Sequence, residues 1–71
     1  MPVVNVQMWE EVLDAEREAQ TIAGITDALA DVFGEQIREF VVVIVQGVPQ
    51  HRWGNAGVPA SRTRPISAAD V

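Results

Sequence analysis

The sequence predicts an α+β fold: a β-α-β unit with two parallel strands, one long helix and a short C-terminal hairpin or arm, assembled as an oligomer. Three observations support this prediction. An alternating stretch opens the chain over residues 3–9, an amphipathic pattern covers residues 15–33, and a run of Phe, Val and Ile fills residues 40–45. A helix between two strands is the usual crossover connection of a parallel pair.

The first strand is predicted from a period of two. Val4, Val6 and Met8 fall on one face, and Asn5 and Gln7 fall on the other. This alternation is typical of a strand with one face against a core and one face toward a polar environment.

A turn over residues 10–13 leads into the predicted helix. Asp14 is the expected N-cap, because its carboxylate can accept hydrogen bonds from free amides of the first turn. Gly34 fits the position just past the helix end, where a positive φ is favoured. At about 1.5 Å per residue the helix is roughly 30 Å long, enough to run back along the first strand. Its expected apolar stripe consists of Ala15, Ala19, Ile22, Thr26, Leu29 and Phe33.

The second strand, residues 40–45, contains no alternation, so both of its faces are expected to be buried. One helix covers one face of a two-stranded sheet, and no other segment is apolar and long enough to cover the second. We therefore expect another copy of the chain or a sister chain to bury that face.

The C-terminal part is expected to be short and irregular. Residues 47–49 leave the sheet, residues 53–57 form a tight turn, and residues 58–64 add a hairpin or an extended arm. We expect a single domain over residues 1–71, with a core at 2–64 and a flexible tail at 65–71. A chain of 71 residues without cysteine buries only about 60% of its unfolded surface, which favours oligomerisation as the extra support.

Composition excludes several function classes. Residues 1–50 carry two arginines and nine acids (−7), whereas residues 51–71 carry three arginines and one acid (+2). An acidic body disfavours nucleic acid as a partner, since phosphate contacts need a basic face. His51 is the single histidine and cysteine is absent, so no metal site is expected. No segment resembles a signal peptide or a membrane span, which predicts a cytoplasmic protein.

The order of several short motifs carries a family resemblance. The motifs are Pro2 at the head of a strand, residues 25–28 (Ile-Thr-Asp-Ala) in the helix, the hydrophobic second strand, Val48-Pro49, Trp53-Gly54, Gly57 and the closing residues 60–64. Over residues 2–64 the chain resembles the 4-oxalocrotonate tautomerase family of the tautomerase superfamily. The resemblance implies β-α-β units that pair into dimers and assemble as a hexamer.

The resemblance also implies a cofactor-free isomerase that catalyses keto-enol tautomerisation of a small carbonyl acid. Pro2 is the expected general base once Met1 is removed, because its nitrogen is then a free secondary amine. A free α-amino group has a pKa of about 7.7 to 8.0, and apolar surroundings lower it toward neutrality. Trp53 is expected as an aromatic wall of the substrate pocket, and Trp9 is expected to face the same cavity.

The chain departs from the family at two positions. Active tautomerases use two arginines to grip the carboxylate and to stabilise the enolate oxygen. Counting without gaps from Pro2 places the first at Val12, and counting back from Trp53 places the second at Val42. Arg17 and Arg52 are the candidates for replacing this anion contact in a pocket assembled from several chains. Arg38 lies four residues before Val42, about 13 Å along a strand, and is too far to substitute.

Other interpretations remain open at this stage. The chain is alternatively a non-catalytic or half-catalytic subunit, completed by an arginine-bearing sister chain in a hetero-oligomer. A third hypothesis is a binding module that holds a hydrophobic ligand between Trp9 and Trp53, although packing explains both residues equally well. The resemblance also implies that a dehalogenase, a decarboxylase or a hydratase could use the same proline. The sequence does not distinguish these activities from a tautomerase. The remaining charged residues are interpreted as solvated or structural: Glu10 and Glu11, Asp27 and Asp31, His51, Arg62 and Arg64.

Overall fold

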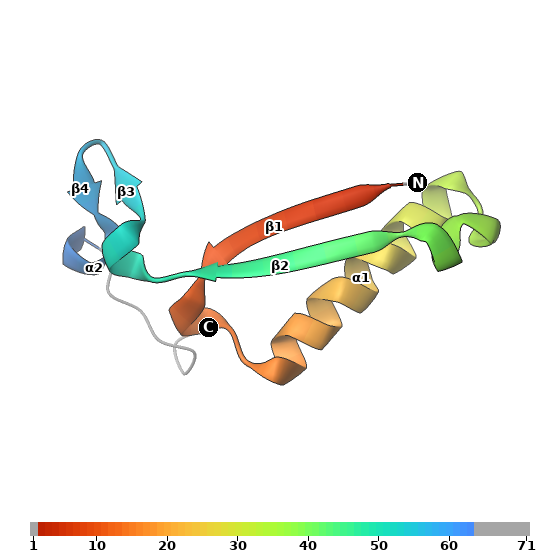
Figure 1. The fold of residues 1–71 in the computed structure, drawn as a ribbon, viewed down its shortest axis with the longest axis horizontal. Helices are drawn as coiled ribbons and strands as arrows, with labels where there is room; N and C mark the ends of the chain where they lie inside the picture. The colour runs from red at the N-terminus through yellow and green to blue at the C-terminus, as the bar shows by residue number, and fades with distance from the viewer. Residues whose placement is uncertain (1, 64–71) are drawn as a thin grey trace.

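The computed structural model describes residues 2–63 (Figure 1). The tail predicted at residues 65–71 lies outside them. The elements in chain order are β1 (Val3–Trp9), the 3₁₀ helix η1 (Glu10–Val12), α1 (Ala15–Phe33), the 3₁₀ helix η2 (Glu35–Phe40), β2 (Val42–Val48), the 3₁₀ helix η3 (Gln50–Arg52), β3 (Gly54–Asn55), β4 (Val58–Pro59) and α2 (Ala60–Thr63).

The central unit is a parallel β1-β2 pair with α1 on one side of it (Figure 1). The register runs from Val3 opposite Val42 to Trp9 opposite Val48. Half-buried residues alternate with exposed ones as far as Gln7 in β1 and Gly47 in β2. The predicted β-α-β fold is therefore confirmed, and α1 covers a single face of the sheet.

The second strand begins and ends later than predicted. Phe40 belongs to η2, and the ladder begins beyond it with the Val42 N–H, which donates to the Pro2 carbonyl at 3.0 Å. Strand β1 begins at Val3, and the residue that pairs with Val3 in the register is Val42. Gly47 and Val48, expected to leave the sheet, instead pair with the end of β1. Pro49, which has no N–H to donate, then follows the strand.

Helix α1 has the predicted ends. The Asp14 carboxylate accepts a hydrogen bond of 2.8 Å from the Arg17 backbone N–H. Gly34 follows the helix with φ +107°, and its N–H donates to the Ala30 carbonyl at 2.9 Å. The N-cap and the glycine position are thus confirmed.

The buried face of α1 differs from the predicted stripe. Ile22 and Phe33 are 41% and 63% exposed. The half-buried positions include Thr21, Ile25, Thr26 and Leu29, and Ala30 is buried, so only Thr26 and Leu29 of the predicted stripe lie on the inner side. The sequence offers two neighbouring apolar stripes that overlap at these positions, and a two-stranded sheet is too narrow to cover both. The second stripe therefore stays open in a single copy.

The C-terminal region forms the predicted hairpin but not an extended arm. Strands β3 and β4 are antiparallel, and Ala56 and Gly57 between them have φ values of +54° and +81°. Two consecutive positive φ values are typical of a tight two-residue hairpin turn. The chain then becomes helical in α2, where the Ala60 N–H donates to the Trp53 carbonyl at 2.7 Å. That bond closes the hairpin into a compact loop, so no arm extends over residues 60–63.

The core of a single copy is small. Among residues 2–63 the buried apolar residues are Val12, Ala30 and Ala60, and no large side chain is fully buried. The radius of gyration is 14.7 Å, whereas a compact chain of this length has about 11 Å. Within the described residues, no helix combines the length and apolar character needed to cross a membrane.

Candidate active site

Pro2 lies at the start of β1, next to β2. Its carbonyl accepts the N–H of Val42 at 3.0 Å, so the two predicted site residues are neighbours across the parallel pair. Pro2 is half-buried, and Val42 is 45% exposed on the sheet face away from α1. The backbone of Pro2 is thus fixed by the sheet at the edge of an uncovered apolar surface.

Trp9 and Trp53 meet at the other end of β1. Their rings pack edge to face, with centroids 6.2 Å apart and planes at 81°. Trp53 is held by two backbone hydrogen bonds, from its N–H to the Gln50 carbonyl at 3.2 Å and to its carbonyl from Ala60. The Trp9 Nε1–H is buried and has no acceptor among the described residues.

The two groups of predicted residues lie far apart in one copy. Trp9 is the seventh residue after Pro2 along an extended chain, which corresponds to about 23 Å. In Figure 1 the start of β1 and the β3-β4 hairpin accordingly lie at opposite ends of the sheet. A cavity lined by both Pro2 and the tryptophans, as the sequence predicts, therefore requires a second copy.

Val12 and Arg17 lie together below the end of β1. Val12 is only 7% exposed, and its carbonyl accepts a hydrogen bond of 3.2 Å from Arg17 Nη1. Arg17 Nε also lies 3.9 Å from the carboxylate of Asp14. A hollow of about 270 Å³ is lined by Met8, Val12, Leu13, Arg17, Gln20 and Thr21. The guanidinium of Arg17 is therefore already bound within its own chain, by the Val12 carbonyl and the Asp14 carboxylate.

Arg52 lies beside Trp53 in a different setting. A hollow of about 280 Å³ is lined by Gln7, Val48, Arg52, Trp53 and Gly54. Within the described part of the chain Arg52 forms no ion pair, in contrast to Arg17 and Arg38. Of the two arginines predicted as anion contacts, Arg52 is the one whose charge is unmatched.

Glu11 has a structural role that the sequence did not indicate. Its carboxylate accepts the backbone N–H of Gln50, with Oε1 and Oε2 at 3.2 and 3.1 Å. The prediction that Glu11 is a solvated charge is wrong, because its carboxylate is bound to the backbone. The contact joins residues 39 apart, so no local pattern could reveal it, and it anchors the segment that carries Arg52 and Trp53.

Arg38 is committed to an ion-pair cluster. Its Nη1 lies 2.6 Å from Asp27 Oδ1 and its Nε lies 2.5 Å from Glu35 Oε1, joining η2 to α1. The hydrogen bond from Arg38 lowers the pKa of the Glu35 carboxyl below its ordinary value of 4.5. The hydrogen bonds to Glu35 and Asp27 raise the pKa of Arg38. Asp27 is therefore paired rather than simply solvated, and Arg38 is not a substitute for the missing arginines.

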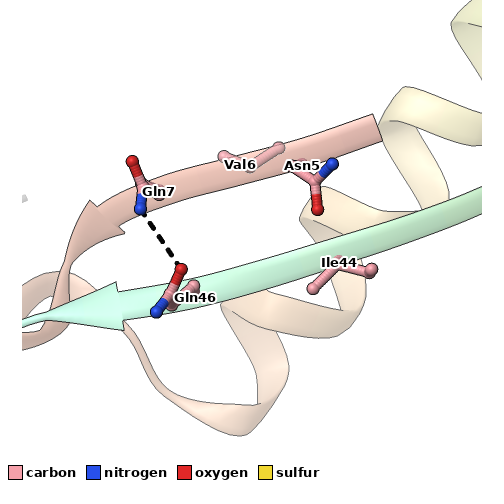
Figure 2. Close-up of a pocket in the computed structure, with 5 residues that line it drawn as sticks. All are labelled: Asn5, Val6, Gln7, Ile44 and Gln46. Carbon is pink, nitrogen blue, oxygen red and sulfur yellow. Dashed lines mark hydrogen bonds between the residues drawn. The ribbon is translucent and has the colours of Figure 1, made fainter. Parts of the chain in front are cut away.

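The uncovered sheet face carries amides among its apolar residues (Figure 2). A hollow of about 360 Å³ is lined by Asn5, Val6, Gln7, Ile44 and Gln46. Gln7 Nε2 donates to Gln46 Oε1 at 3.2 Å, across the register that pairs these two residues. Ile44 is 49% exposed on the same face. This face combines exposed β-branched residues with a fixed amide pair.

Comparison with known proteins identifies the family. The family model described as tautomerase enzyme matches residues 2–62. Probable tautomerase K2 of Dickeya dadantii is 34% identical over 64 residues, which cover 90% of this chain and 94% of that protein. Probable tautomerase RSp0893 of Ralstonia nicotianae is 39% identical over 64 residues, covering 90% and 89%.

The solved structures agree with the sequence relatives. A structure from a study of the 4-oxalocrotonate tautomerase isozymes of Methylibium petroleiphilum superposes with a TM-score of 0.78 at 27% identity. The match covers 89% of this chain and 98% of that one. The resemblance inferred from the motif order is confirmed, and the chain belongs to the tautomerase family.

Proposed function

We propose that this protein is a cofactor-free isomerase that tautomerises a small carbonyl acid, with the amine of Pro2 as general base after removal of Met1. The observation that carries the proposal is the position of Pro2 at the head of β1. Its carbonyl is fixed by Val42 N–H at 3.0 Å, so its nitrogen has a defined place at the end of the sheet. Membership of the tautomerase family supports the same chemistry.

The chemistry requires an amine that is unprotonated near neutral pH. A free α-amino group has a pKa of about 7.7 to 8.0, and apolar neighbours lower it by disfavouring the charged form. Val3 and Val42 provide such neighbours on the uncovered face. The neutral amine takes a proton from the enol oxygen or a carbon of the substrate, and the resulting ammonium returns it elsewhere on the same molecule.

The proposal includes assembly of at least two copies at the site. The aromatic wall of Trp9 and Trp53 lies about 23 Å from Pro2 within one copy, so it would face the Pro2 of another. The exposed apolar face, with Val42 and Ile44, is the surface that a second copy would bury. A homo-oligomer, with the hexamer as the expected form, would therefore bring the two ends of the sheet together.

The test begins with intact mass spectrometry, which is expected to find the native protein without Met1. The enol form of a small 2-oxo acid should then ketonise faster in the presence of the processed protein. Pro2→Ala should reduce this rate by about 100-fold or more, because the positioned base is lost. Glu16→Ala, at an exposed position of α1 outside the proposed site, is the control. Equal rates for Pro2→Ala and the wild type would disprove the proposal.

A half-catalytic subunit is the second candidate. Val12 is buried and Val42 is apolar, so neither position supplies the cation expected to stabilise an enolate oxygen. In this case a sister chain would contribute the arginines in a hetero-oligomer. The purified chain would then be inactive alone and active when co-assembled with that sister chain, whereas a fully active homo-oligomer excludes it.

A further inference from the structure

Among the described residues, some arginines form ion pairs with carboxylates and others do not. Arg38 lies between the carboxylates of Asp27 and Glu35. Arg17 is engaged by Asp14 and by the Val12 carbonyl. Arg52 and Arg62 form no ion pair with a described residue. Two arginines are thus available to an external anion.

Arg52 lines a hollow at the end of the sheet. Its neighbours there are Gln7, Val48, Trp53 and Gly54, around a volume of about 280 Å³. Residues 49–63 contain no Asp or Glu, and the Glu11 carboxylate that reaches this segment accepts the Gln50 N–H. The segment around Arg52 is therefore a local positive region on an acidic chain of net charge −5.

The position of Arg52 is fixed through its neighbours. The Arg52 N–H donates to the Pro49 carbonyl at 2.9 Å, and Trp53 is tied to Gln50 and Ala60. Glu11 fastens the same 3₁₀ turn to the end of β1 through Gln50. A guanidinium on a fixed backbone loses less freedom on binding than one on a loose loop.

The lining has the chemistry of a small-acid site. A guanidinium binds a carboxylate through two parallel hydrogen bonds, and an indole offers a flat apolar wall to an unsaturated carbon skeleton. Val48 adds an apolar side to this hollow. Its volume lies just below the range typical of drug-sized ligands, which suits a small acid.

We propose that Arg52 is the carboxylate-binding residue of this protein, and that the hollow between Arg52 and Trp53 takes the carboxylate end of a small unsaturated acid. In this arrangement Arg52 provides the anion contact that valines at positions 12 and 42 cannot. The catalytic use of the site rests on the proposed function of Pro2. Binding of the carboxylate does not, because the hollow belongs to the opposite end of the chain.

The test uses tryptophan fluorescence, since the only two tryptophans, Trp9 and Trp53, both lie at this end. The purified oligomer is titrated with fumarate, and with fumaramide as the uncharged analogue. Fumarate is expected to give a saturable change that fumaramide does not give. Arg52→Gln should weaken fumarate binding by about tenfold or more, because a charge-assisted bidentate contact is lost.

The matched controls are Arg62→Gln, which removes an unpaired arginine outside the hollow, and Arg17→Gln, which removes the alternative anion contact. Both should bind fumarate like the wild type. An unchanged affinity in Arg52→Gln would overturn the proposal, as would a loss equal to that of Arg62→Gln or an absence of saturable binding in the wild type. Pro2→Ala should still bind fumarate, so failure of Pro2 as base and failure of Arg52 as anion contact give different results.

Discussion

Val12 and Val42 occupy the two positions where the family resemblance places arginines, but their surroundings differ. Val12 is 7% exposed beneath the end of β1, and Arg17 already donates to its carbonyl. Val42 is 45% exposed and hydrogen-bonded to Pro2. An arginine at position 12 would have to bury a charge next to a second guanidinium, which is costly. The valine at 12 therefore belongs to the packing of this chain, and in the proposed site the positive charge is taken from Arg52.

The Glu35-Arg38 pair predicts a pH dependence of stability. The hydrogen bond from Arg38 lowers the pKa of Glu35 in the folded protein, so folding favours the ionised carboxylate. The resulting stabilisation is present above the unfolded pKa and is lost as pH falls through the lower folded value. Arg38 stays charged over this pH range, so it does not itself make the stability depend on pH. We expect the thermal midpoint to fall more steeply below about pH 4.5 in the wild type than in Glu35→Gln.

The measurement is thermal unfolding at fixed protein concentration, because the midpoint of an oligomer depends on concentration. Glu39→Gln is the matched control, since Glu39 is an exposed acid of the same 3₁₀ helix. The thermal midpoint of Glu39→Gln should fall with decreasing pH as it does in the wild type. An equally steep fall of the midpoint in Glu35→Gln and in the wild type would contradict the prediction.

The end of α1 provides a test at the level of the element. Gly34 has φ +107°, and an added Cβ there would overlap the side-chain amide of Gln36. Gly34→Ala should therefore lower the free energy of unfolding by about 1 to 2 kcal/mol. Gly24, inside the same helix, has open space around an added Cβ. Gly24→Ala should instead raise it by about 0.5 to 1 kcal/mol, because alanine is the better helix former.

Denaturant unfolding of the two variants measures both effects with the same substitution. The changes in the free energy of unfolding are expected to have opposite signs. Because both variants add the same methyl group, the difference between the two changes reports the effect of the backbone conformation at position 34. A Gly34→Ala variant as stable as Gly24→Ala would show that the positive φ has no energetic consequence.

The elements also show how far the sequence determines the fold and the site. The ends of α1 are local, set by Asp14 and Gly34, and the sequence predicts both. The start of β2 depends on where β1 begins, so the hydrophobic character of Phe40 could not locate it. The inner face of α1 depends on the width of the sheet, which left Ile22 exposed. Likewise the sequence can nominate residues for a site, such as Arg52 and Trp53. It could not predict the contact of Glu11 with Gln50, because these residues lie 39 apart in the chain and meet only in the folded structure.

As a single copy, the molecule is extended and leaves much of its apolar surface exposed. Its radius of gyration of 14.7 Å exceeds the value of about 11 Å for a compact chain of this length. The uncovered face leaves Val3, Val42 and Ile44 from 45% to 56% exposed. The same geometry places the start of β1 and the β3-β4 hairpin at opposite ends of the sheet (Figure 1). The assembly proposed above would both bury the apolar face and bring the two ends of the sheet together.

A subunit-mixing experiment tests whether one site uses two copies. Pro2→Ala and Arg52→Gln are each expected to be nearly inactive as homo-oligomers. If the two variants are unfolded together and reassembled, some sites receive Pro2 from one copy and Arg52 from another. Random equal mixing in a symmetric oligomer should restore about a quarter of the wild-type rate. The double variant Pro2→Ala/Arg52→Gln, mixed with itself, is the control. If Pro2 and Arg52 of the same copy formed each site, every site in the mixture would lack one residue and no activity would return.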